Sequence, residues 1–126
     1  MSIRYLSLEN LLALAEDLGV PKVRDLGLLD SAAHRPMASF MGHDAYPGVH
    51  EKAAVLFESL LRNHPLIDGN KRLGWVGTFT FYWINGFDLD APEDEAYDLV
   101  IAASTGSLGY EDVAGPLAEW AAPRQR

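Results

Sequence analysis

Apolar residues recur every three or four positions along most of the chain, which is the spacing of a helix that buries one face. The clearest stripe comes first and consists of Leu8, Leu11, Leu12, Ala15 and Leu18. Ser7 is placed to cap the start of this helix, and Gly19 followed by Pro21 is placed to end it. The pattern therefore predicts a helix over residues 8–18.

The same spacing continues through later segments that are bounded by glycine, proline or small polar residues. These segments lie near residues 24–35, 50–63, 71–84, 90–103 and 111–120. Asp90 and Glu93 resemble a capping box at the start of the fourth of these segments. Gly115-Pro116 predicts a kink or a shortened helix in the last one.

The stretches between these helices carry few strand signals. Residues 37–48 contain a Pro-Gly turn signal and are predicted to form an irregular, exposed loop. Short strands are expected only near Ile3 to Leu6 and around Phe87. The sequence thus predicts an all-α protein, a compact helical bundle with minor short strands, in one domain spanning residues 1–126.

Composition narrows the classes of function. The formal net charge of −8 argues against binding nucleic acid, because lysine and arginine drive contact with phosphate backbones. The chain has no cysteine, which excludes disulfides and thiol catalysis, and no apolar run near the ~20 residues of a membrane helix. A cytoplasmic protein without membrane contact is expected.

Polar chemistry is concentrated in one stretch, "HPLIDGNKR", which runs from His64 to Arg72 between two predicted helices. If the second helix begins near Asn70 or Lys71, the N–H groups of Gly69, Asn70 and Lys71 are free donors at its positive end. Such an end binds phosphate, and Lys71 and Arg72 add charged donors. Together with Arg62 they form a positive spot on an acidic protein, which indicates a small anionic ligand.

Two further residues of this stretch suit phosphoryl or nucleotidyl transfer. Asp68 can hold Mg²⁺ together with phosphate oxygens, since Mg²⁺ is usually bound by one or two carboxylates and the substrate. His64 can accept the proton of an attacking hydroxyl at neutral pH. The spacing fits neither a P-loop nor an EF-hand.

Each residue also has a structural interpretation. Asp68-Gly69 is a common turn dipeptide, and Asp68 or Asn70 can cap a helix. The three cations could form a solvated face. The remaining histidines show no metal-binding spacing, so we expect structural or solvated roles for His34, His43 and His50.

The stretch resembles the signature of the Fic/Doc superfamily, His-Pro-Phe-x-(Asp or Glu)-Gly-Asn-x-Arg, and departs from it only in having Leu66 in place of phenylalanine. Four other parts of the chain are similar to the Doc-type branch: "RDLGLLDSAAHRP", the loop that ends in "YPG", "KAAVLFESLLRNHP" and "AASTG". The resemblance implies a compact Fic/Doc helical fold over most of the chain.

The resemblance also implies a role for each residue of the signature. His64 is expected to be the general base and Asp68 the Mg²⁺ ligand. Gly69, Asn70 and Lys71 are expected to form the phosphate-binding nest, with Arg72 as the phosphate clamp. Arg62, two residues before the base, is expected to face the nucleotide. The implied substrates and cofactors are ATP and Mg²⁺.

Lys71 bears on which reaction the family resemblance implies. Fic proteins usually have glycine at this position and transfer AMP to a protein hydroxyl, whereas Doc-like toxins have lysine and transfer the terminal phosphate of ATP. The expected function is therefore phosphorylation of a serine or threonine in a translation protein, an elongation factor by analogy, causing growth arrest. AMP transfer, a catalytically silent nucleotide- or partner-binding module, and a purely structural domain are the alternatives.

The resemblance also bears on regulation. Many Fic proteins carry an inhibitory helix, (Ser or Thr)-x-x-x-Glu-(Gly or Asn), and its nearest match here, "SLGYED" from Ser107 to Asp112, fails at the last position. We expect that segment to be an ordinary helix start. Inhibition is then expected from a separate protein, a Phd-like antitoxin whose disordered tail folds beside the site.

Overall fold

The computed structural model describes residues 2–125, and helices dominate this part of the chain. The helices are α1 (Leu8–Asp17), α2 (Leu26–His34), α3 (Val49–Arg62), α4 (Asn70–Ile84), α5 (Glu93–Thr105) and α6 (Tyr110–Trp120), with a short 3-10 helix at Arg35–Met37. The predicted all-α class is confirmed.

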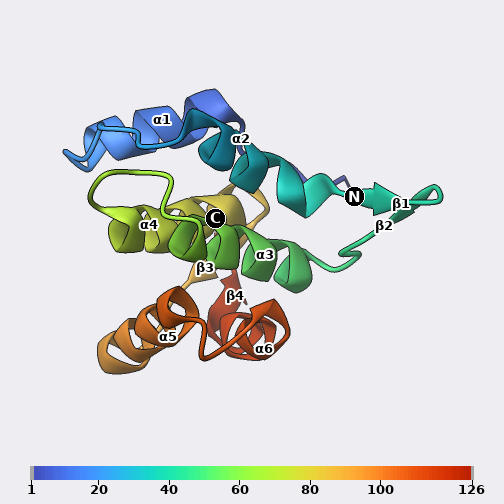
Figure 1. The fold of residues 1–126 in the computed structure, drawn as a ribbon. Helices are drawn as coiled ribbons and strands as arrows, with labels where there is room; N and C mark the ends of the chain where they lie inside the picture. The colour runs from blue at the N-terminus through green and yellow to red at the C-terminus, as the bar shows by residue number, and fades with distance from the viewer. Residues whose placement is uncertain (1, 126) are drawn as a thin grey trace.

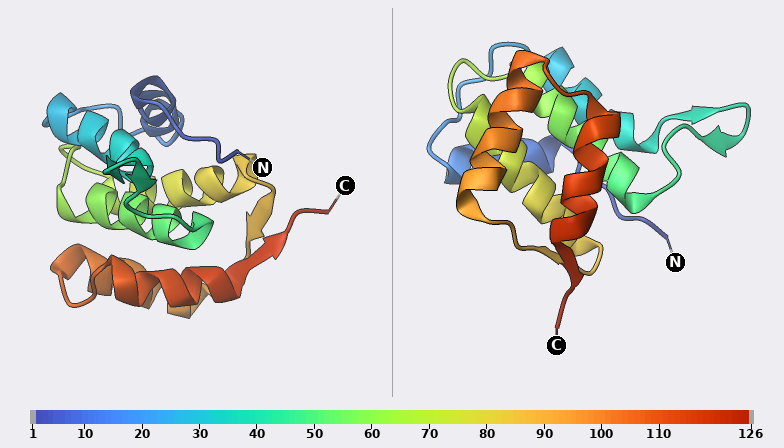
Figure 2. Two further views of the ribbon diagram at one scale, coloured as in Figure 1. Left: turned by 90° about the vertical axis from the view of Figure 1, so that its right-hand side faces the viewer. Right: turned by 90° about the horizontal axis from the view of Figure 1, so that it is seen from below.

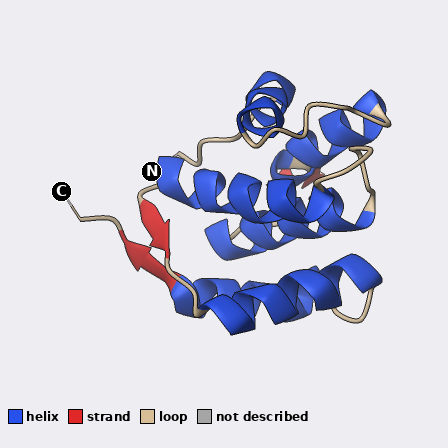
Figure 3. Ribbon diagram, turned by 90° about the vertical axis from the view of Figure 1, so that its left-hand side faces the viewer, coloured by secondary structure: helices blue, strands red, loops and turns tan. Residues whose placement is uncertain are grey.

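The strands are short and pair as two antiparallel ribbons. β1 (Ser39–Phe40) pairs with β2 (His43–Asp44), and β3 (Phe87–Leu89) pairs with β4 (Ala121–Pro123), which Figure 3 shows in red beside the C-terminus. The strand predicted around Phe87 is confirmed, but residues 3–6 form no strand. Their backbone bonds to a side chain instead: Arg4 N–H donates to Asn85 Oδ1 (2.8 Å), and Asn85 Nδ2 donates to Arg4 C=O (2.9 Å).

Residues 37–48 were predicted to form an irregular exposed loop; residues 39–44 form the β1–β2 hairpin, and residues 45–48 are irregular as predicted. The two turn residues of the hairpin, Met41 and Gly42, both have positive φ, 52° and 81°. Positive φ at both positions is the geometry of a type I′ turn, which usually carries Asn-Gly or Asp-Gly. Because Met-Gly is not one of these sequences, the turn could not be recognised from the sequence.

Four predictions concern where helices start and end. Ser7 caps α1 through a capping box with Asn10, as its position predicted. The capping box predicted at Asp90 is wrong, because the residue before α5 is Pro92 and no side chain caps it. A kink or a shortened last helix was predicted at Gly115-Pro116; the helix is not shortened, because α6 continues through Pro116 to Trp120, and the kink stays a prediction. The start of α6 at Tyr110 agrees with the helix start expected within Ser107–Asp112.

Helix α3 forms the centre of the molecule, and its residues from Lys52 to Leu61 are all buried. Figures 1 and 2 show α3 and α4 in a middle layer, with α1 and α2 on one side and α5 and α6 on the other. Gly74 lets α3 and α4 pack closely, because a Cβ there would lie 2.6 Å from Leu61 Cδ2. No described helix is both long and apolar enough to cross a membrane.

Buried charge on α3 is paired and joins the layers. Glu58 accepts a hydrogen bond from Arg35 Nη1 (2.7 Å) with one oxygen and from the backbone N–H of Tyr110 (2.7 Å) with the other. Lys52, 1% exposed, donates to the Pro36 carbonyl (3.0 Å) and to Asp44 Oδ2 (3.2 Å). These contacts join α3 to the 3-10 helix, to β2 and to the start of α6.

Candidate active site

The loop that joins α3 to α4 is anchored along its backbone to the segment before α2. The Pro65 carbonyl accepts the N–H groups of Arg24 (2.8 Å) and Asp25 (3.0 Å), and Ile67 N–H donates to the Lys22 carbonyl (2.9 Å). These three hydrogen bonds stabilise the loop in its position against the segment before α2.

Arg24 also fixes the backbone of His64. Its Nε donates to the His64 carbonyl (2.7 Å) and its Nη2 to the Asn63 carbonyl (2.8 Å). His64 has φ of 49°, a left-handed conformation that is uncommon outside glycine. The imidazole itself is exposed. Arg24 thus holds the residue while leaving its side chain free.

Sequence reasoning did not single out Arg24 as a site residue. A lone arginine before a helix has no pattern of its own, and it lies 40 positions from His64. Only the fold brings the two together.

Asn70 closes the other end of the loop. Its Oδ1 accepts the N–H of Leu66 (2.8 Å), and its Nδ2 donates to the carbonyl of Leu66 (3.0 Å). Both polar atoms of this side chain therefore help to hold the loop, and the second Nδ2–H and the backbone N–H of Asn70 remain for a ligand. Leu66, the departure from the family pattern, is 1% exposed and acts as an apolar anchor.

Gly69 precedes α4, has φ of 87° and provides no side-chain cap. A Cβ at this position would lie 2.5 Å from Val20 Cγ1, so the glycine is required by packing against Val20 as well as by its φ. Its N–H is bonded to Asp68 Oδ1 (2.9 Å), and the first bond of α4 runs from Leu73 N–H to the Gly69 carbonyl (2.9 Å). The open donors are therefore the N–H groups of residues 70–72, one position later than the sequence indicated.

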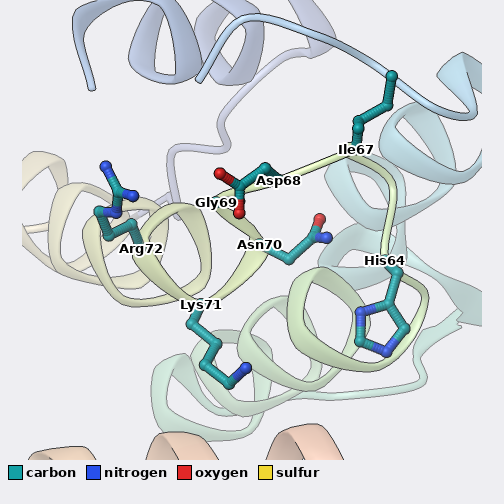
Figure 4. A pocket seen from close by; sticks show the side chains of 7 residues that line it. All are labelled: His64, Ile67, Asp68, Gly69, Asn70, Lys71 and Arg72. Carbon is teal, nitrogen blue, oxygen red and sulfur yellow. The ribbon is translucent and has the colours of Figure 1, made fainter. Parts of the chain in front are cut away.

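The start of α4 faces a hollow of about 300 Å³ lined by His64 and residues 67–72. Figure 4 shows the side chains of Lys71 and His64 on the same side of this turn, with Arg72 directed away from His64. Within residues 2–125, no ion pair involves Lys71 or Arg72. Two cations at the N-terminus of a helix are electrostatically unfavourable, because that end of the helix dipole is also positive. An anion bound in this hollow would offset the repulsion.

Asp68 lies at the rim of the same hollow and is exposed. Because Oδ1 is bonded to Gly69 N–H, Oδ2 is the oxygen left for a cation. Among the described residues, no group of three or more histidine and carboxylate side chains could hold a metal by itself. The arrangement fits Mg²⁺ shared with substrate phosphates and does not fit a metal held by protein alone.

The structure does not bring Arg62 into this hollow. Its Nη2 donates to the Leu108 carbonyl (2.9 Å) and lies 3.9 Å from Glu58 Oε2, and its Nε lies 3.5 Å from the Ala103 carbonyl. Arg62 thus connects α3 to the α5–α6 turn. The other predicted residues, His64, Asp68 and the four that follow, line one cavity.

Comparison with known proteins identifies the family to which this sequence belongs. The family model described as Fic/DOC family matches residues 5–82, which include the whole loop and most of α4. The chain is also 48% identical over 109 residues to Toxin Doc of Mycolicibacterium smegmatis (strain ATCC 700084 / mc(2)155), covering 85% of this chain and 84% of that protein. Both findings agree with the signature from His64 to Arg72. The chain belongs to the Fic/DOC family.

Proposed function

We propose that this protein is a Doc-type toxin, a kinase that uses ATP and Mg²⁺ to phosphorylate a serine or threonine hydroxyl of another protein. The observation that carries the proposal is the start of α4, an uncapped helix N-terminus with Lys71 and Arg72 in its first turn and His64 on the same cavity. The similarity to a protein named Toxin Doc supports the toxin role.

In the proposed reaction the backbone N–H groups of residues 70–72 and the ammonium of Lys71 bind phosphate oxygens. His64 accepts the proton of the target hydroxyl, whose oxygen bonds to the terminal phosphorus while the bond from that phosphorus to the ADP oxygen breaks. The products are ADP and a phosphoprotein. Mg²⁺, held by Asp68, would neutralise phosphate charge when bound.

The side chain at position 71 favours phosphate transfer over AMP transfer. A lysine fills space in the cavity that a glycine would leave empty, and it adds an ammonium for a phosphate oxygen. The pose of the nucleotide decides which phosphorus faces the hydroxyl. AMP transfer through the same His64 remains the rival reaction.

The proposed target is a protein of the translation machinery, an elongation factor by family analogy, whose modification would arrest growth. The proposed partner is an antitoxin with a disordered, Phd-like tail. Glu111, the closest counterpart of a self-inhibitory glutamate, lies in the first turn of α6 and does not line the cavity. This supports inhibition by a separate protein.

The experiment that tests the proposal uses purified protein, bacterial lysate and Mg²⁺, with ATP labelled on either the γ- or the α-phosphate. Label on a protein band from γ-labelled ATP alone is the expected result. Label from α-labelled ATP alone would establish AMP transfer and overturn the kinase assignment.

Lys71→Gly serves as the companion variant. It should weaken transfer from γ-labelled ATP because the ammonium is lost, and transfer from α-labelled ATP would show that the nucleotide has changed its pose. An unchanged product at an unchanged rate would mean that position 71 does not set the pose.

A further inference from the structure

One large apolar side chain at the cavity lies outside the core. Ile67, the free position of the Fic/Doc signature, is 64% exposed, whereas its neighbour Leu66 is 1% exposed. The backbone N–H of Ile67 donates to the Lys22 carbonyl (2.9 Å), a contact that any residue other than proline would make. This anchor of the loop therefore does not need the isoleucine side chain, which is available to a partner molecule.

Ile67 lines two hollows that meet at the loop. One is the cavity at the start of α4, which it shares with His64, and the other is a hollow of about 150 Å³. Val20 and Pro21, from the segment between α1 and α2, form the apolar wall of this second hollow, which we call the Ile67 hollow. Asp68 also lines both, so the two are continuous. Figure 4 shows the side chain of Ile67 directed away from His64.

The size and lining of the Ile67 hollow fit a single apolar side chain. Sites for small molecules usually measure about 300–1,000 Å³, so the hollow is too small for a nucleotide. A volume of about 150 Å³ does hold a group of the size of a benzene ring. Pro21 has no N–H group, and the N–H of Val20 is bonded to the Ala15 carbonyl (2.9 Å), so this wall offers no backbone donor. Lys22 also lines the hollow, but its side chain is exposed to solvent and adds nothing to an apolar contact.

The proposed reaction brings a protein chain to this place. The hydroxyl that transfers its proton to His64 belongs to a target protein, so the residues beside that hydroxyl must lie along the rim of the cavity. His64 and Ile67 are three positions apart, and three residues span at most about 11 Å. An extended target segment covers the same distance within about three residues of its hydroxyl.

We propose that Ile67 helps to select the residue that is modified: an aliphatic side chain of the target protein, within about three residues of the acceptor serine or threonine, packs against Ile67 in the Ile67 hollow. The inference rests on the proposed function, since it requires a protein hydroxyl at His64. It assigns recognition of the target to the one position of the signature that the family pattern leaves free.

The test measures transfer from γ-labelled ATP to the lysate protein that the wild type labels, over a dilution series of the lysate. Ile67→Ser should raise the half-saturating amount of lysate about tenfold, because an apolar contact with the target is lost. The maximal rate should stay within about twofold of wild type, and half-saturation by ATP should not change. Ile67→Val, which keeps a branched apolar side chain, should stay close to wild type in all three quantities.

Leu26→Ser is the matched control. Leu26 is another apolar residue with an exposed side chain, 53% exposed, and it lines neither of the two hollows. Its substitution should leave half-saturation by lysate unchanged. An equal rise in Leu26→Ser and Ile67→Ser, or no rise in Ile67→Ser, would overturn the inference. A lower maximal rate without a change in half-saturation would also overturn it, because Ile67 would then act on the chemistry and not on the target.

The target supplies the second half of the test. Mass spectrometry of the labelled protein should find an aliphatic residue within about three positions of the modified serine or threonine. Replacing that residue by serine in the purified target should weaken its use by the wild-type enzyme about tenfold and have little further effect with Ile67→Ser, since both changes remove one contact. Polar residues at all of these positions, or additive losses, would overturn the inference.

The outcomes for the wild-type protein separate this inference from the proposed function. Label from α-labelled ATP alone would overturn the kinase assignment, and the same dilution series with that label would still test Ile67. Failure of the wild type to label any protein from either nucleotide would overturn the proposed function together with the role of Ile67.

Discussion

Helices α4 and α5 begin in opposite ways. The first turn of α5 carries Glu93, Asp94 and Glu95, which complement the positive end of its helix dipole. The first turn of α4 has no acidic residue, no side-chain cap and two cations, Lys71 and Arg72. Acidic residues also occupy the first turns of α1, α3 and α6. The first turn of α4 therefore lacks the charge that would complement its own dipole, as expected of a site for an external anion.

The largest expected effect comes from reversing the charge at the start of α4. Lys71→Glu should raise the free energy of unfolding by about 0.5 kcal/mol, because a carboxylate complements the dipole. It should also reduce phosphate transfer at least a hundredfold, on the order of the cost of placing like charges together. Chemical denaturation and the labelling assay measure the two effects.

Asp94→Lys is the matched reversal on α5. Asp94 is exposed and does not line the cavity at the start of α4, so the variant should lower stability by a similar amount and leave transfer unchanged. Wild-type transfer by Lys71→Glu would contradict the contrast between the two helices.

Gly69→Ala should be the next largest effect. The substitution adds a Cβ against Val20 at a residue with φ of 87°, and we expect it to lower the free energy of unfolding by about 2 kcal/mol. Gly86→Ala, at φ of 89° with no atom within 4 Å of the added Cβ, should cost only the backbone strain of about 1 kcal/mol. Equal costs in urea titrations would show that Val20 does not set the constraint.

Arg24→Ala tests how the loop holds His64. Without the two hydrogen bonds from Arg24, the His64 backbone loses support for its left-handed conformation. We expect transfer to fall about tenfold, because small displacements of a reacting group are costly. The loss of stability should be about 1 kcal/mol. Lys22→Ala is the control: it removes a nearby cation and keeps the backbone carbonyl that contacts the loop, so transfer should be unchanged. An equal loss of transfer in both variants would assign the effect to the change in net charge and not to the support of His64.

The smallest expected effect is the pH dependence of stability that arises from His50, a residue outside the cavity. Burial lowers the pKa of His50, whose Nδ1 lies 2.9 Å from the Tyr82 hydroxyl. The unfolded state therefore binds more protons than the folded state below the ordinary histidine pKa, and stability should fall as pH decreases through about 6.5. His50→Gln should flatten this slope in denaturation curves, whereas His43→Gln on the exposed hairpin should not. An unchanged slope in His50→Gln would assign the pH dependence to another group.

Much of the fold could be predicted because apolar spacing determines which helix faces are buried. The starts of α1 and α4 also agree with their predictions, since Ser7 and Gly69 act through local backbone geometry. The β1–β2 hairpin could not be predicted, because its Met-Gly turn lacks the usual signal. The partner of β3 lies more than thirty positions away at Ala121–Pro123, so no local pattern reveals it.

The candidate site also combines features that the local sequence predicts with features that it does not. The signature from His64 to Arg72 is local, and it places His64 and residues 67–72 around one cavity. The anchoring by Arg24, the contact of Val20 with Gly69 and the position of Arg62 depend on helix packing. The side-chain role of Asn70 as a clamp on Leu66 follows from the loop conformation, which the sequence does not specify.

We expect the charged residues at the start of α4 and the exposed His64 to serve the reaction and to contribute little to folding. A comparison of wild-type protein with His64→Ala, in γ-phosphate transfer to lysate proteins and in denaturant unfolding, decides between a catalytic and a structural role for His64. We predict an unfolding free energy within about 0.5 kcal/mol of wild type, as expected for an exposed side chain, and a loss of transfer of at least about a hundredfold. Undiminished transfer by folded His64→Ala would contradict the catalytic role.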